Sequence, residues 1–366
     1  MMAHNFLAPL LSLALALACA GAVAALVGVD PLAALQALVF GAVGYGEAVG
    51  YTLYYATSFI FVGLAVALPY RAGLFNIGGE GQATVGGLGC GLIALALPAG
   101  PWPLVAVGGV AAAAAFGAAW GAGPGWLQAR RGSHVVITTI MFNFIAAALM
   151  TWLMVDVLIA PGQQSPQSVA FGPAARMPAM ADAAGWLGGE LPASPLNLSF
   201  PLALLCCLAA WLYVSHTRAG YALRVVGANP KAALYAGMSP ARQTIIAMTL
   251  AGALAGLAGV NEILGAHHRI ILNFTGGLGY VGIAVALMGR NHPLGVVFAA
   301  LLFGALYQGG SEMSFEFPEL TREVVVVIQG LAVLFTGALE NLFRRPLALG
   351  LAWVGSRARA VEEGEG

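Results

Sequence analysis

Five polar side chains that could bind a small solute fall within or beside long apolar runs of this sequence. They are Asn76, Glu80, Gln82, Asn143 and Glu262. A carboxylate at membrane depth is rare, and it normally faces the interior of a helix bundle or a water-filled cavity. We therefore expect these residues to line the path of a polar substrate.

Three of the five belong to the segment GLFNIGGEGQ, which covers residues 73–82. Its glycines weaken a regular helix, and a membrane tolerates such backbone only where it is buried in protein or lines a cavity. The segment is therefore a substrate path or a helix junction. In the second case Glu80 caps backbone amides at a broken helix and never meets substrate.

A second glycine-interrupted segment covers residues 273–295, in the later half of the chain. Paired, interrupted helices in the two halves of a transporter point to a central binding site. Arg290 and His292 fall near the end of this segment, where we expect positive charge to set the orientation in the membrane.

Other polar residues in the apolar runs favour structural roles. We expect the Thr138 and Thr139 hydroxyls to bond to their own helix backbone. His267 and His268 lack the spacing of metal ligands and are expected to be solvated or to dock a partner. The cysteines, which also lack zinc or redox spacing, are Cys19, Cys90, Cys206 and Cys207.

The sequence patterns of several enzyme classes are absent. There is no Gly-x-x-x-x-Gly-Lys-Ser/Thr phosphate loop, and the only lysine, Lys231, follows Pro230. The His-Glu-x-x-His and Gly-x-Ser-x-Gly patterns are also missing. We expect no catalytic residue, no metal and no cofactor.

Composition indicates an all-α, polytopic transmembrane helix bundle in a lipid bilayer. Hydrophobic residues make up 60% of the chain and charged residues only 8%, whereas soluble domains are roughly a quarter charged. The net charge is zero and no basic tract occurs, so no nucleic-acid partner is expected.

Residues 1–366 are expected to form a single transmembrane domain of about ten helices, because apolar runs of about 20 residues span the hydrocarbon. The predicted spans are 6–29, 51–68, 75–97, 104–121, 135–159, 200–214, 244–264, 278–289, 296–307 and 324–339.

Positive residues near membrane segments tend to stay cytoplasmic, and ten crossings place both termini on that side. Only Arg176, Arg269 and Arg322 then fall outside. The residues assigned to the inside are Arg71, Arg130, Arg131, Arg218, Arg224, Lys231, Arg242, Arg290, Arg344, Arg345, Arg357 and Arg359. The loop 161–198 is therefore predicted outside, and the loop 215–243 inside.

The inner loop contains the sequence GANPKAALYAGMSPAR. Asn229 is a good helix cap, Pro230 suits the first helical position, and Gly237 is placed to end the helix. The pattern predicts a helix of about two turns, which is marginal alone and needs a protein surface to rest on.

Three motifs together resemble a known family. The spacing of Ala232, Ala233 and Gly237 is similar to the Ala-Ala-x-x-x-Gly core of the loop by which ABC importer permeases contact their ATPase. With GLFNIGGEGQ and GYVGIAVALMGRNHPLG, residues 51–339 resemble the permeases of the branched-chain amino acid, ribose and nucleoside importer family, closest to the nucleoside and simple-sugar type. Lys231 stands where the generic loop motif has an acidic residue, and its downstream Ile-x-Leu-Pro element is missing.

The resemblance implies a pore subunit in a bacterial inner membrane that works by alternating access. Its implied partners are cytoplasmic ABC ATPase subunits, a second permease subunit in a homo- or heterodimer, and an extracytoplasmic substrate-binding protein. ATP hydrolysis would take place on the ATPase. The implied coupling residues are Asn229, Pro230, Ala232, Ala233 and Gly237.

Two other classes remain open from the residues alone. A secondary carrier driven by protons or sodium would use Glu80 or Glu262 as its titrating group. A membrane enzyme would need a catalytic constellation, which the sequence lacks. Genes for an ABC ATPase and a secreted binding protein beside this one would favour the importer.

Overall fold

The computed structural model describes residues 20–321 apart from Leu187, together with the single positions 18, 324, 326, 327, 330, 331 and 334. Within this part the regular elements are helices, and the only strand-like pairing is in two isolated bridges. The predicted all-α class is therefore confirmed for the described residues. Most of the predicted span 324–339 and the first half of the span 6–29 lie outside the described residues.

Six described helices are long and apolar enough to cross a membrane. Each contains one of the predicted runs or nearly all of it. They are α3 (Gly46–Tyr70), α5 (Trp102–Arg131), α6 (Val135–Trp152) with the π-helical η1 (Leu153–Val157), α8 (Ser199–His216), α11 (Pro240–Gly259) with the π-helical η3 (Val260–His267), and α13 (Pro293–Glu316). The total of about ten spans stays a prediction.

Three apolar helices fall outside that group. Glu80, Gln82 and several glycines dilute the apolar character of α4 (Gly79–Ala96). The 11 residues of α12 (Leu278–Met288) rise about 16 Å, roughly half of the hydrocarbon thickness. The sequence analysis missed α2 (Pro31–Val43), because its 13 residues are fewer than a span needs.

The shorter elements belong to the two long loops. The loop 161–198 holds a 3-10 turn, η2 (Pro173–Ala175), and the helix α7 (Met180–Trp186). The loop 215–243 holds α9 (Arg218–Ala228) and α10 (Pro230–Tyr235).

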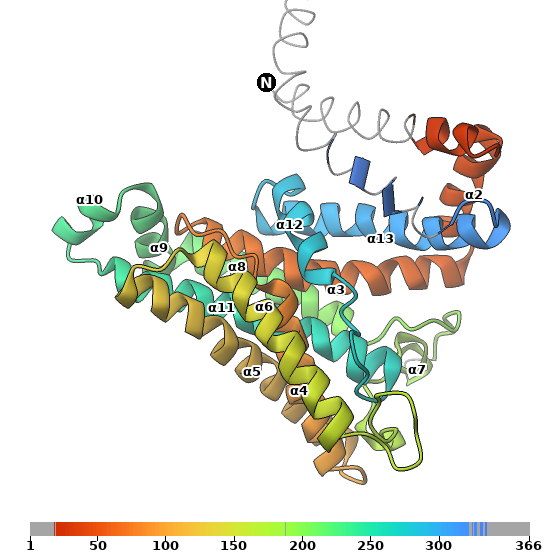
Figure 1. The fold of residues 1–366 in the computed structure, drawn as a ribbon, viewed down its shortest axis with the longest axis horizontal. Coiled ribbons are helices and arrows are strands. Elements are labelled where there is room, and N and C mark those ends of the chain that lie inside the picture. Colours follow the sequence, from red (N-terminus) through yellow and green to blue (C-terminus); the bar gives the residue numbers. More distant parts are fainter. Residues whose placement is uncertain are drawn as a thin grey trace, which may run out of the picture. The chain divides into compact units, whose positions relative to one another are not determined.

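The described chain divides into two compact units. Described residues within 42–308 form one, and the described residues of the segments 1–41 and 309–366 form the other. In the larger unit, α9 and α10 lie together at one end and α7 lies at the other (Figure 1). The polar residues considered below all belong to this larger unit.

The centre of the larger unit is α3, which is buried over most of its length, whereas α5, α6 and α8 expose many apolar side chains. Such an apolar exterior suits lipid. Small residues let α5 and α11 approach closely. A methyl group on Gly252 would lie 2.1 Å from the carbonyl oxygen of Gly117, and one on Gly256 would lie 2.3 Å from that of Ala113.

Candidate functional site

Glu80 lies in the first turn of α4, and its carboxylate caps the start of α12. Oε1 accepts hydrogen bonds from the Thr275 hydroxyl at 2.6 Å and the Gly277 amide at 3.0 Å, and Oε2 accepts from the Gly279 amide at 2.8 Å. The first amides of a helix lack partners within the helix, and negative charge there is stabilising. Glu80 therefore ties the two glycine-interrupted segments together.

Gly279 makes this cap possible through close backbone approach. A methyl group on Gly279 would lie 2.0 Å from the Glu80 nitrogen. Any larger residue at position 279 would push α12 away from α4 and lengthen the hydrogen bonds to the carboxylate.

The turn before α4 is held by three amide side chains. The Asn76 Nδ2 group donates to the Ala65 carbonyl at 3.1 Å and to Oε1 of Gln82 at 2.9 Å. From α6, Asn143 Oδ1 accepts from the Gly81 amide at 2.9 Å, and its Nδ2 group donates to the Ile77 carbonyl at 3.0 Å. The break in the helix is thus joined to α3 and α6.

Glu262 lies in the π-helical segment η3 and is 6% exposed. Its Oε2 accepts from the Tyr54 hydroxyl at 2.5 Å, and its Oε1 accepts from the Ser58 hydroxyl at 2.7 Å. The His267 Nε2 atom lies 3.9 Å from Oε2. Single π-helical turns occur frequently at functional sites.

The neighbouring Asn261 extends this set of hydrogen bonds. Its Nδ2 group donates to the Ser58 hydroxyl at 2.8 Å, and its Oδ1 accepts from the side-chain Nδ2 group of Asn197 at 2.9 Å. We call Tyr54, Ser58, Asn197, Asn261 and Glu262 the Glu262 network.

The structure brings four of the five predicted path residues together and leaves Glu262 apart. Asn76 reaches α3 at Ala65, whereas Glu262 reaches it at Ser58. These two positions on α3 are about 10 Å apart along the helix axis. The chain therefore holds polar groups at two levels along the same buried helix.

The predicted short helix in the loop 215–243 is confirmed as α10. The Asn229 side chain accepts from the amides of Lys231 at 3.0 Å and Ala232 at 3.1 Å, and Gly237 takes a φ of +75° just after the helix. Ala233 is completely buried within the chain, so it supports α10 from beneath and presents no free surface.

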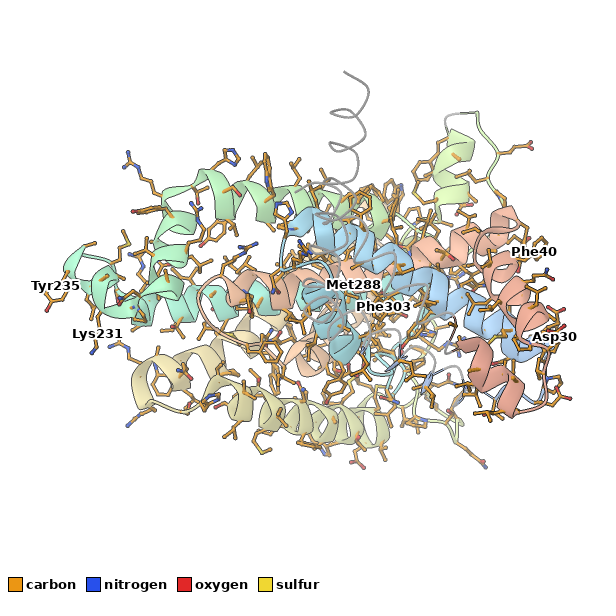
Figure 2. The ribbon with its side chains drawn as sticks, turned by 90° about the horizontal axis from the view of Figure 1, so that it is seen from above. Asp30, Phe40, Lys231, Tyr235, Met288 and Phe303 are labelled. Carbon is orange, nitrogen blue, oxygen red and sulfur yellow. The ribbon has the colours of Figure 1, made fainter. Side chains whose placement is uncertain are left out.

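The exposed tip of α10 consists of other residues. Tyr235 is 97% exposed and Leu234 is 61% exposed. Figure 2 shows Lys231 and Tyr235 at the far end of this projection, with the tyrosine ring directed outward. The sequence analysis did not single out Tyr235 because only the fold shows which face of so short a helix is free.

Comparison with known proteins decides between the open classes. A family model described as "Branched-chain amino acid transport system / permease component" matches residues 48–336. The chain belongs to this family. It is a multi-pass membrane protein and the non-catalytic permease component of an ABC importer, so the carrier and enzyme alternatives are excluded.

Three similar proteins cover most of the permease. It is 35% identical to a guanosine ABC transporter permease protein of Bacillus subtilis, over 91% of this chain and 93% of that protein. It is 34% identical to a glucose ABC transporter permease protein of Haloferax volcanii, over 89% of this chain and 86% of that protein. It is 32% identical to a nucleoside ABC transporter permease protein of Lactococcus lactis, over 82% of this chain and 83% of that protein. No solved structure matches it significantly.

Other expectations for the permease can be checked against its contacts. The Thr138 and Thr139 hydroxyls bond to the carbonyls of His134 and Val136, as predicted, each at 3.0 Å. Among the described residues, no group of histidine, cysteine or acidic side chains could hold a metal ion.

Basic residues of the permease gather at the α9 end. The Arg71 guanidinium donates to the Asn291 carbonyl at 2.8 and 3.2 Å. A methyl group on Gly227, in α9, would lie 2.2 Å from the Arg71 carbonyl oxygen. Arg71, Arg290 and the basic residues of α9 therefore share one end.

Proposed function

We propose that this permease imports nucleosides, with ribose or another simple sugar as the next candidate. The observation that carries the proposal is similarity over about nine-tenths of the chain to a permease named for guanosine, supported by relatives named for nucleosides and glucose. The family description names branched-chain amino acids, but it covers a wider group of permeases than these three relatives. The proposed substrate therefore follows the relatives.

The proposed substrate path passes the two polar groups on α3. Asn76, Glu80, Gln82 and Asn143 would shape its inner part, and Glu262 would lie in its outer part. Side chains that already bond to two or three helices are suited to this role, because a change in helix packing moves them together. During alternating access these hydrogen bonds would stay intact while the path opens to one side of the membrane and closes to the other.

The proposed coupling surface is the α9–α10 projection. Membership of the family implies an ATPase and a binding protein as partners. Asn229, Pro230 and Gly237 would set the position of α10, Ala233 would anchor it to the chain, and Ala232 would lie on its exposed side. Exposed aromatic side chains are common anchors in protein interfaces, so Tyr235 joins this set.

The proposed orientation places the α9–α10 end and both termini in the cytoplasm. The gathering of basic residues at that end supports it, because positive charges near membrane segments tend to stay inside. The loop 161–198 and the binding protein would then be on the outer side. A second permease subunit, the same or different, would complete the pore.

The test is transport by the assembled complex. The permease is coexpressed with a candidate ABC ATPase and binding protein from the same organism, reconstituted in proteoliposomes, and supplied with guanosine, ribose, glucose or leucine. We expect ATP-dependent uptake of guanosine, with a sugar as the alternative. Uptake of leucine alone, or uptake without ATP, would contradict the proposal.

A further inference from the structure

The loop 161–198, the end of η3 and Trp102 at the start of α5 line an open cavity of about 890 Å³. Its lining includes Trp102, Arg176, Asp182, Trp186, Gly265 and His268. Ligand-binding cavities are typically about 300–1,000 Å³, with aromatic walls and a few convergent polar groups. The size and lining of this cavity therefore fit a small organic molecule.

Backbone hydrogen bonds hold the walls of the cavity in place. The amides of Met177 and Phe171 donate to the carbonyls of Leu264 and His268, at 2.9 and 2.8 Å. On the other side, the Met180 amide donates to the Leu196 carbonyl at 2.8 Å. The loop is thus fixed along η3 and along the segment before α8, so the walls of the cavity are held by backbone hydrogen bonds.

The charges around the cavity balance. Burial lowers the pKa of His268 below its ordinary value, the hydrogen bond to the Leu264 carbonyl opposes this, and the positive charges of Arg176 and Arg269 lower the pKa further, which favours the neutral imidazole. Arg176 and Asp182 then supply one charge of each sign. Such a lining favours a neutral ligand with hydroxyl groups over an anion, because a carboxylate accepts hydrogen bonds and a guanidinium donates them.

The two indoles supply an apolar surface. The rings of Trp102 and Trp186 have centroids 5.5 Å apart and are tilted by 34°, and both rings remain substantially exposed. Indole faces bury large apolar area, which suits the flat base of a nucleoside or the C–H face of a sugar ring.

The floor of the cavity connects to the Glu262 network. Gly265 lines the cavity, and a methyl group placed on it would lie 2.1 Å from the Asn197 side-chain nitrogen. Asn197 in turn donates to Asn261. A ligand resting on Gly265 would therefore be separated from the buried polar groups of α3 by one layer of side chains.

We propose that this cavity is the first binding site of the permease for its neutral, hydroxyl-rich substrate. Trp102 and Trp186 contact the ring of the solute, while Asp182 and Arg176 bind its hydroxyl groups. The site lies on the path between the binding protein and the Glu262 network, and this inference rests on the proposed function.

The test uses the purified full-length permease without its partners, titrated with radiolabelled guanosine, ribose or leucine. We expect saturable binding of guanosine or ribose, weakened at least tenfold by Asp182→Asn and by Trp186→Ala. Trp186→Phe, which keeps an aromatic ring, should recover part of the affinity. The matched controls are Asp156→Asn in η1 and Trp152→Ala at the end of α6, which are exposed and do not line the cavity; they should bind normally.

Three outcomes would overturn the inference: no binding of guanosine or ribose, binding unchanged in both Asp182→Asn and Trp186→Ala, or leucine competing as well as guanosine. Uptake by the reconstituted complex separates this failure from failure of the proposed function. If the complex transports guanosine and the cavity variants transport it equally well, the first binding site is wrong while the importer assignment stands. If the complex transports neither nucleoside nor sugar, both proposals fail.

Discussion

At the scale of single residues, the carboxylates of Glu80 and Glu262 accept hydrogen bonds from different kinds of donor. Glu80 accepts from two backbone amides at the start of α12, those of Gly277 and Gly279, and from one hydroxyl, so it is coupled to the position of a whole helix. Glu262 binds two side-chain hydroxyls of α3, which can rotate without moving the backbone. Glu80 is therefore suited to hold geometry, and Glu262 to respond to a solute.

The substitution Glu80→Gln tests that assignment. An amide nitrogen in place of one carboxylate oxygen would face a backbone N–H donor, and the remaining hydrogen bonds would lose their charge. Because hydrogen bonds to charged groups contribute about 1.5–3 kcal/mol, we expect lower thermal stability in detergent and reduced uptake per inserted molecule. Thr275→Val, which leaves both amide bonds in place, should have a smaller effect on each. Normal stability and normal uptake in Glu80→Gln would contradict a role for the charge.

Sequence patterns located these carboxylates but not their partners. Glu80 stood out because a charged residue among glycines in an apolar run is costly. The helix-junction alternative predicted that its carboxylate caps backbone amides, and it does. The capped helix begins about 200 residues later, so no local pattern could identify it. Tyr54 and Ser58 in α3 and Asn197 before α8 were missed for the same reason, since their polar groups are ordinary until a distant carboxylate or amide is placed beside them.

At the scale of elements, close contact between α5 and α11 fixes the frame that carries both polar groups. The sequences Gly-x-x-x-Gly at positions 117–121 and 252–256 face each other, which is the arrangement expected of helices packed in lipid. Glu262 lies in the π-helical continuation of α11, so the position of α11 sets the position of its carboxylate.

Gly252→Ala should disturb this frame. The added methyl group would lie 2.1 Å from the Gly117 carbonyl oxygen, and backbone cannot move aside as a flexible side chain can. Overpacking of this kind costs about 1–3 kcal/mol or more, so we expect a clear fall in melting temperature and in the monodisperse fraction. The control is Gly108→Ala on α5, whose methyl group would be 3.4 Å from Ile93. Equal melting temperatures for the two variants would show that the contact is not tight.

Elements were predictable where their signals are local. Asn229, Pro230 and Gly237 predicted α10 because a cap, a first-turn proline and a terminating glycine act within a few residues. The burial of Ala233 was not predictable, because it depends on packing against other parts of the fold. The same holds for the π-helical ends of α6 and α11, which have no distinctive sequence.

At the scale of the whole molecule, the two long loops lie at opposite ends of the larger unit (Figure 1). We predict that cysteines introduced at Lys231 and at Gln164, both exposed, react with an impermeant thiol reagent from opposite sides of the membrane. The native cysteines are replaced first, and right-side-out and inverted vesicles are compared. Labelling of both positions from the same side would overturn the proposed topology.

Coupling of the permease to its ATPase depends on the whole assembly. Tyr235 is fully in solvent at the tip of α10, whereas Ala233 on the same helix is buried in the permease, so the tyrosine is the side chain available to a partner. Truncating an aromatic anchor typically costs about 2 kcal/mol or more, roughly a thirty-fold weaker contact. We expect Tyr235→Ala to fold and insert normally but to retain less ATPase on purification and to lose substrate-stimulated ATP hydrolysis.

Tyr51→Ala, which removes an exposed tyrosine from α3, provides the matched control and should keep both properties. Full ATPase retention and stimulation in Tyr235→Ala would show that the tip of α10 is not a coupling contact, because no other part of this short helix offers so large an exposed side chain.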